Sequence, residues 1–230
     1  MQGASWSRKR KAARAGGDDD DDQDEKEKNT DTVYSIYSIN NHVHFNDDVT
    51  PQSMFLLARE LRLLAQKLRL RAITFEAPVQ PIYLHVSTSG GEISAAFSVV
   101  DCIKNLGVPV YSVMDGFVAS AGTLITLAAE RRFIEANAYM LIHQLSSGVW
   151  GKMNDIHEQV DNLKKLMEHI TAFYLEHTTL KTKVLQKLLL RDVTWNAQES
   201  ITRGIADEIY ARPSESTTPA THKRFKAACV

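Results

Sequence analysis

Apolar residues recur every three or four positions in two long stretches of this chain, which is the spacing of one face of a helix. Before the first stretch stand Thr50, a residue type that caps helices, and Pro51, which suits the first helical position. The apolar positions that follow them are Met54, Leu57, Leu61, Leu64 and Leu68. The second stretch begins at Asn154 and ends near residue 177. Its apolar positions are Ile156, Val160, Leu163, Met167, Ile170 and Tyr174.

The apolar stripe of the second stretch is as narrow as a coiled-coil seam. Such a stripe most often packs into the core of its own chain. Its narrowness also suits packing against another helix, so we keep two alternatives: core of this chain, or contact with a partner subunit.

Three short apolar runs, over residues 82–86, 108–114 and 138–142, contain many β-branched and aromatic residues and predict buried strands. A helical pattern that starts at Glu92 separates the first two runs. Strand, helix and strand make a βαβ unit with a right-handed crossover, and the third run repeats it. The sequence therefore predicts an α/β fold with a parallel sheet.

The remaining segments give weaker signals. Residues 32–45 predict an extended segment or two short strands broken at Asn40-Asn41, and residues 72–81 predict a surface loop with two prolines. Residues 146–152 should be exposed and extended or looped. A short helix is expected after Thr178, and a last helix, turn and strand over residues 195–210.

The segment 115–122, Asp-Gly-Phe-Val-Ala-Ser-Ala-Gly, places one hydroxyl, Ser120, among small residues between a predicted strand and a predicted helix. At a helix start, free backbone N–H groups and the helix dipole can stabilise an oxyanion. Taken alone, Ser120 is more simply interpreted as a helix cap. The pattern therefore makes Ser120 a candidate nucleophile with a structural alternative.

Two further features meet the same edge of the predicted sheet. Gly90-Gly91 follows the strand 82–86 and allows a positive φ and a close approach to a ligand. His143 follows the strand 138–142, at the carboxyl end where α/β sheets bind ligands. A Ser-His-Asp triad also needs a carboxylate, and the pattern alone does not place Asp192 beside His143.

Composition narrows the classes of function. The chain has 230 residues, 43% of them hydrophobic, and a formal net charge of −1, so no basic excess favours nucleic-acid binding. No apolar run approaches the roughly 20 residues that cross a bilayer, so we expect no membrane partner. Cys102 and Cys229 match neither a disulfide framework nor a metal site, and a reducing compartment fits them. We expect no metal and no cofactor.

Residues 1–31 hold a basic block and then an acidic block, and we expect a disordered tail that is merely solvated or carries a targeting signal. Residues 212–230 predict a polar C-terminal tail.

Four motifs, in this order and at these separations, resemble the Clp protease proteolytic subunit (ClpP) family of serine peptidases. They are Ser87–Gly91, Gly116–Gly122, Leu141-Ile142-His143-Gln144 and Arg191-Asp192. The resemblance covers roughly residues 33–210 and implies a peptidase domain over residues 32–211. It implies a crotonase-like α/β fold of repeated βαβ units with a protruding handle helix over about 154–177.

The resemblance also implies roles for individual residues. Ser120 would be the nucleophile, His143 the general base and Asp192 its orienting carboxylate, and the N–H groups of Gly91 and Ala121 would form the oxyanion hole. Residues matching the family's substrate-pairing strand are Ser146, Ser147, Gly148 and Val149. Two heptameric rings would stack through the handle helices into a tetradecamer that encloses the sites and degrades unfolded polypeptides. The compartment would be the cytoplasm or an organellar matrix or stroma.

The sequence departs from the family in several places. Ser89 stands where the family usually has proline, and Leu190 where an acidic residue is common. Tyr83 and Phe133 match the family's docking pocket for an AAA+ unfoldase, the only route by which ATP would act. His85 and Asn105 replace aromatic residues there.

These departures leave three functions open. The first is an active ATP-dependent-type Clp serine endopeptidase. The second is a catalytically silent structural or regulatory subunit of a mixed ring. The third is a viral or phage maturation protease of the same fold that works without an ATPase.

Overall fold

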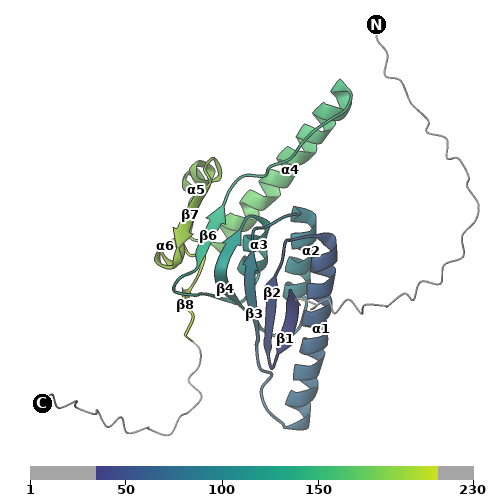
Figure 1. Ribbon diagram of the computed structural model, residues 1–230, viewed down its shortest axis with the longest axis vertical. Coiled ribbons are helices and arrows are strands. Elements are labelled where there is room, and N and C mark those ends of the chain that lie inside the picture. The colour runs from purple at the N-terminus through teal and green to yellow at the C-terminus, as the bar shows by residue number, and fades with distance from the viewer. Residues whose placement is uncertain (1–34, 212–230) are drawn as a thin grey trace, which may run out of the picture. The chain divides into compact units, whose positions relative to one another are not determined.

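A computed structural model describes residues 35–211 as one mixed α/β unit (Figure 1). The strands are β1 (Ile36–Ile39), β2 (His42–Asn46), β3 (Ile82–Thr88), β4 (Val110–Ala119), β5 (Arg131–Ile134), β6 (Tyr139–Ile142), β7 (Val193–Asn196) and β8 (Glu208–Ile209). The helices are α1 (Pro51–Thr74), α2 (Ile93–Lys104), α3 (Ala121–Leu127), α4 (Met153–His177), α5 (Thr182–Leu189) and α6 (Ala197–Thr202).

The strands form one sheet in the order β1-β2-β3-β4-β5-β8. Strands β2, β3, β4 and β5 pair in parallel, and β1 forms an antiparallel hairpin with β2. The long strand β4 has two partners: its first half pairs with β5 and its second half, Phe117–Ala119, with β6. Because β6 also carries β7 in antiparallel pairing, the sheet branches just before Ser120.

Helices α1 and α2 lie side by side along the sheet (Figure 1). The start of α1 is as predicted: the Thr50 hydroxyl accepts a hydrogen bond from Ser53 N at 3.0 Å, and Pro51 is the first helical residue. All five predicted apolar positions of α1 are buried. They form one core with the sheet, α2 and the short helix α3.

Helix α4 confirms the long helix predicted from residue 154 and begins one residue earlier. Figure 1 shows its first half extending away from the sheet. Ile170 and Tyr174, in the second half, are buried in the core. Ile156 and Leu163, in the first half, are only half-buried, and Val160 is exposed. The second half of the seam therefore packs into the core of this chain, and contact of the first half with a partner subunit stays a prediction.

Several predicted boundaries were wrong. Helix α1 continues through Thr74, so the loop predicted from residue 72 starts later. The helix can extend this far because residues 52–77 contain no glycine and no proline. Strand β4 continues past Met114 to Ala119, because its second half gains β6 as a partner. The segment 146–152 contains no helix or strand, as predicted.

Two strands were missed. The sequence predicts no strand over residues 131–134, where β5 lies, and it assigns only the end of β7, from Trp195, to the last helix, turn and strand. Both have four residues, like β6, but neither Arg-Arg-Phe-Ile nor Val-Thr-Trp-Asn is a continuous apolar run of the kind that identifies β6. The tails expected at residues 1–31 and 212–230 lie outside the residues that the structure describes.

Candidate active site

Ser120 lies between the end of β4 and the start of α3, in a backbone conformation that few side chains adopt. Its φ is 53° and its ψ is −124°. Such a conformation costs roughly 1–3 kcal/mol and persists only where surrounding contacts hold it. Ser120 occupies the cap position of α3, but its side chain makes no capping hydrogen bond. Within residues 35–211 its hydroxyl forms no hydrogen bond at all, so it serves no capping role here.

The Gly90-Gly91 turn packs directly on Ser120. A Cβ placed on Gly90 would lie 2.7 Å from the Ser120 Cβ and 2.9 Å from the Ala119 carbonyl oxygen. Gly91 has φ 145°, and a Cβ there would lie 2.2 Å from the Val49 oxygen. Only glycines fit these positions. The predicted convergence of two backbone turns is therefore confirmed.

The backbone N–H of Gly91 points away from its neighbouring strand. Val49 N donates to Gly90 O and Glu92 N donates to Val49 O, both at 2.8 Å, around a parallel bridge between Val49 and Gly91. In parallel pairing, the central residue of such a bridge directs its own N–H to the opposite side. Ala121 is the first residue of α3, so its N–H has no partner within the helix. Both donors predicted for an oxyanion hole thus belong to the two touching turns.

His143 and Asp192 are brought together by the strands before and after them. Ile142, the last residue of β6, pairs with Val193, the first residue of β7, so the residues just outside this pair face each other. The His143 Nδ1 atom lies 3.4 Å from the Asp192 Oδ1 atom. This exceeds the 2.7–3.2 Å of an ordinary N–H···O hydrogen bond. The Asp192 side chain is 78% exposed.

Backbone pairing also ties Ser120 to the strand that leads to His143. Ser120 N donates to Leu141 O at 2.9 Å, two residues before His143. No hydrogen bond joins the side chains of Ser120 and His143 in the described part of the chain. Such bonds are often long before substrate binds. The structure therefore places His143 beside Asp192, and backbone pairing links Ser120 to the strand that leads to His143.

The segment predicted to pair with substrate leaves its backbone available. Gln144 N donates to Leu189 O at 2.9 Å, and Leu145 N contacts the Met167 sulfur at 3.4 Å. Beyond these anchors Ser146, Ser147 and Gly148 are exposed and Val149 is half-buried. Among the described residues, none of these four makes a backbone-to-backbone hydrogen bond. An added extended strand could therefore pair with them.

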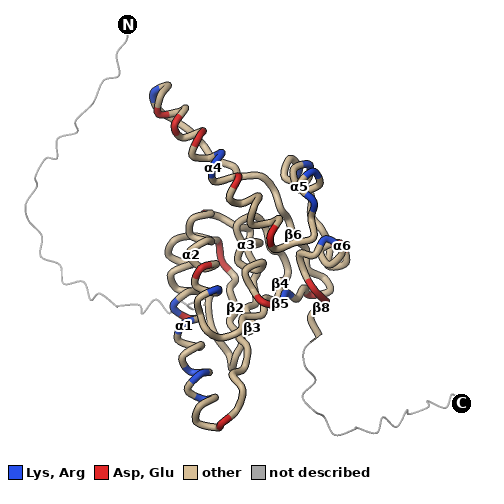
Figure 2. Tube along the Cα trace, turned by 180° about the vertical axis from the view of Figure 1, so that it is seen from behind, with Lys and Arg blue, Asp and Glu red and all other residues tan. Residues whose placement is uncertain are grey.

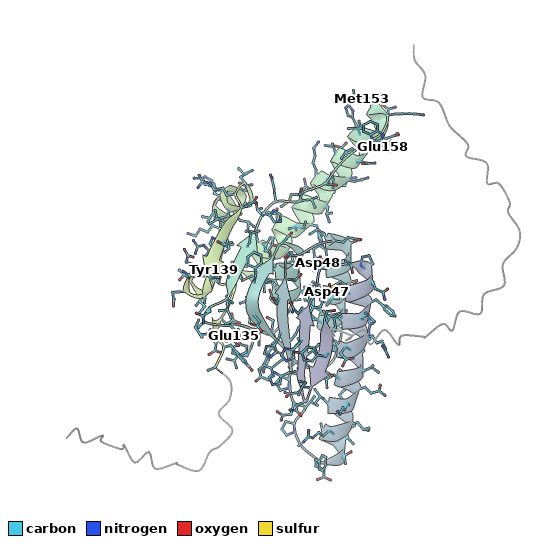
Figure 3. All side chains as sticks on the ribbon, in the orientation of Figure 1. Asp47, Asp48, Glu135, Tyr139, Met153 and Glu158 are labelled. Carbon is cyan, nitrogen blue, oxygen red and sulfur yellow. The ribbon has the colours of Figure 1, made fainter. Side chains whose placement is uncertain are left out.

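A cavity of about 300 Å³ lies at the same edge of the sheet. Its lining residues are Asn46, Asp47, Asp48, Ser87, Thr88, Ser89 and Phe117. Figure 3 labels the two aspartates at the end of β2. We did not single them out from the sequence, although an Asn-Asp-Asp run after a predicted strand is a recognisable signal. They add negative charge beside the turn that precedes Gly90.

An aromatic and histidine cluster covers part of the sheet surface. Tyr83 and Phe133 lie with ring centroids 6.3 Å apart, and His42 stacks on Tyr83 at 4.8 Å. His85 replaces an aromatic residue of the expected docking pocket and stacks on His44 at 4.4 Å. This surface is therefore aromatic in character despite that substitution.

Residues 35–211 lack two features: a metal-holding group of side chains and an apolar helix of membrane-spanning length. No three histidine, cysteine or acidic side chains in this range are grouped to hold a metal ion. No helix of this range is both long and apolar enough to cross a membrane.

Known proteins that are similar to this chain include Clp protease subunits. The family model described as Clp protease matches residues 27–213. The chain is 34% identical over 175 residues to the ATP-dependent Clp protease proteolytic subunit 2 of Treponema denticola, covering 71% of this chain and 88% of that protein. It is also 34% identical over 137 residues to the ATP-dependent Clp protease proteolytic subunit 1 of Chlamydia muridarum, covering 58% and 71% respectively. The family-model match spans both turns and both strands that carry the candidate residues, and this chain belongs to the Clp protease family.

Proposed function

We propose that this chain is a catalytic subunit of a Clp-type serine endopeptidase that hydrolyses peptide bonds of unfolded polypeptides. The observation that carries the proposal is the state of Ser120: a strained backbone, a hydroxyl without a structural bond, and a glycine turn packed on it. Strain of this kind persists at sites where it has a use. The residues 32–211 would form the peptidase domain.

In the proposed reaction the Ser120 oxygen attacks the carbonyl carbon of the scissile peptide bond. His143 Nε2 accepts the serine proton and then gives it to the leaving amine. Asp192, next to His143 Nδ1, orients the ring and stabilises its charged form. Water then attacks the acyl-enzyme with His143 again as base, and Ser120 is released. These steps use only side chains of this chain and water, so no cofactor is required.

The negative charge that develops on the carbonyl oxygen would be held by the N–H groups of Gly91 and Ala121. Two backbone donors of this kind stabilise the transition state because their positions are fixed before the reaction begins. Ser89, in place of the family's usual proline, leaves both N–H groups intact.

The backbone of Ser146, Ser147, Gly148 and Val149 would pair with an extended substrate. Main-chain pairing tolerates many side chains, which suits an enzyme that degrades unfolded polypeptides. Substrate selection would then depend mainly on entry to the site.

For the assembly we propose heptameric rings, of this chain alone or mixed with a second subunit, that stack through α4 as the handle helix. The half-buried and exposed apolar residues in the first half of α4 support a contact there. The aromatic cluster around Tyr83 would be the docking surface for an AAA+ unfoldase. Proteolysis would take place in the cytoplasm or in an organellar matrix or stroma.

The direct test is labelling of the native oligomer with a fluorophosphonate probe, which phosphonylates activated serines with loss of fluoride. We expect one labelled site, Ser120, and no label on Ser120→Ala. An assembled wild-type protein that stays unlabelled would contradict the proposal.

A catalytically silent subunit is the second candidate, and one observation favours it. The 3.4 Å between His143 and Asp192, together with the missing Ser120 to His143 bond, describes a triad that is not fully aligned. Peptidase assays of the purified oligomer separate the two candidates. Hydrolysis that Ser120→Ala abolishes supports the active subunit, and hydrolysis only after a second subunit is added supports the silent one.

A further inference from the structure

A buried chain of two hydroxyl groups leads from α4 to the carbonyl of Ser120. Thr123 Oγ1 donates to Ser120 O at 2.7 Å, and the Tyr174 hydroxyl lies 2.6 Å from Thr123 Oγ1. Thr123 is fully buried and Tyr174 is 2% exposed. The contact joins the helix that starts at the candidate nucleophile to the helix that extends from the sheet.

The direction of these hydrogen bonds follows from proton counting. A threonine hydroxyl has one proton, and here it goes to Ser120 O, so Tyr174 must donate to Thr123. Burial raises the pKa of Tyr174 to about 12, so its phenol keeps its proton at neutral pH. Thr123 N also donates to Ser120 O, at 3.0 Å. The Ser120 carbonyl is thus held by two donors, one of which is itself held by Tyr174.

The orientation of this carbonyl fixes a second group. The carbonyl of Ser120 and the N–H of Ala121 belong to the same planar peptide unit and point in opposite directions. Any rotation of the unit that moves the carbonyl away from Thr123 also turns the Ala121 N–H. With φ 53° and ψ −124° at Ser120, the unit needs such contacts to stay in place.

We propose that Thr123 and Tyr174 are positioning residues that hold the peptide unit between Ser120 and Ala121 with its N–H directed at the oxyanion. This proposal rests on the proposed function. It adds that Thr123 and Tyr174 are the residues that keep the oxyanion hole formed. Neither residue touches substrate.

The test compares threonines one helical turn apart. Thr123→Val removes the hydroxyl and keeps the branched shape, whereas Thr123→Ser keeps the hydroxyl. Thr126→Val is the matched control, because Thr126 is equally buried in α3 and donates to Thr123 O at 2.9 Å, not to Ser120. The double variant Thr123→Val with Tyr174→Phe leaves no buried hydroxyl without a partner and so guards against a mere loss of folding.

For hydrolysis of a peptide substrate, we expect Thr123→Val to lower kcat roughly tenfold, about the worth of one hydrogen bond lost in the transition state. KM should change less than twofold, since the bond does not hold the ground state of the substrate. Thr123→Ser should retain wild-type kcat, and the double variant should be as slow as Thr123→Val. If Thr126→Val lowered kcat as much as Thr123→Val, general loosening of α3 would explain the effect and the proposal would be wrong.

Amide hydrogen exchange separates this proposal from the proposed function. Thr123→Val should exchange the amides of residues 119–124 faster than Thr126→Val does, whether or not the protein hydrolyses peptides. An unlabelled wild-type oligomer with this faster exchange would refute the peptidase and leave the positioning contact supported. Equal exchange in the two variants would overturn the positioning contact whatever the activity.

Discussion

At the scale of single residues, Ser120 and Gly91 both have a positive φ, but for different physical reasons. At Gly91 the space for a side chain is filled by the Val49 carbonyl, so glycine is a steric requirement. At Ser120 a side chain is present in spite of the strain, and its hydroxyl supports nothing in residues 35–211. The fold therefore requires a glycine at position 91. It does not require the hydroxyl of Ser120.

Removing the Ser120 hydroxyl should consequently separate activity from stability. We expect Ser120→Ala to change the free energy of unfolding by less than about 0.5 kcal/mol, because no hydrogen bond is lost. Peptide hydrolysis should fall by a factor of about 1,000 or more, since the nucleophile is gone. Urea unfolding and a peptidase assay on the same preparation check both. A variant that loses stability and activity together would assign Ser120 a structural role.

Gly91→Ala should do the reverse and damage the fold first. Its Cβ would lie 2.2 Å from Val49 O at a φ of 145°. We expect a loss of about 2–4 kcal/mol in unfolding free energy from strain and the displaced backbone. Gly148→Ala is the control, because a Cβ there meets nothing within 4 Å. Equal urea midpoints for the two variants would show that the turn is looser than described.

At the scale of elements, the sequence predicts the helices in which the apolar period is repeated many times. It does not predict the strands whose existence depends on backbone pairing with a neighbouring strand. Helix α1, with its cap at Thr50, and α4 have many repeats each, and both were predicted to within a few residues. Strands β5 and β7 are four residues long and exist because β4 and β6 offer them edges. Asp192 could not be placed from the pattern for this reason: its position beside His143 depends on β7. The resemblance to a family supplied what the periodicity could not.

The same limit applies to Thr123 and Tyr174. They are 51 residues apart, on two helices whose packing no local pattern predicts. In the sequence Tyr174 is one more apolar position of the α4 stripe, and Thr123 one more residue of a buried helix. Only the folded chain shows that their hydroxyls meet.

This contact between α3 and α4 predicts how stability changes at alkaline pH. The pKa of Tyr174 is about 12 in the folded chain, against about 10 for an ordinary tyrosine. Because this pKa is raised, the protonated Tyr174 phenol contributes its full share of the unfolding free energy below pH 10. That contribution is lost as the pH rises towards 12. The unfolded chain releases this proton first, so high pH favours unfolding. The loss for one group can reach about 2–3 kcal/mol.

Tyr174→Phe isolates this contribution from those of the other tyrosines and lysines. We expect the unfolding free energy of the wild type, minus that of the variant, to be constant from pH 7 to 9. The difference should then fall steadily as the pH rises above 10. Urea unfolding of the two proteins in parallel at each pH measures it. A difference that stays flat up to pH 11.5 would mean that water reaches the phenol.

At the scale of the whole molecule, α4 combines two environments along one stripe. Its second half belongs to the core through Ile170 and Tyr174. Its first half carries the same apolar spacing beyond the sheet, where the single chain covers it only in part. Figure 2 shows acidic and basic residues along this part of the helix as well. A helix with an apolar seam and a charged opposite face needs a second surface to bury the seam.

Neighbouring residues on the first half of α4 test whether that surface is another subunit. Val160 belongs to the seam and is 38% exposed, and Gln159 precedes it outside the seam. If the proposed rings stack through this seam, Val160→Glu would bury a charge at each contact, which costs several kcal/mol where no partner compensates it. We expect native mass spectrometry to find about seven subunits for this variant and about fourteen for the wild type. Gln159→Glu adds the same charge and should leave the mass unchanged. If Val160→Glu assembles like the wild type, the seam is not where the rings meet.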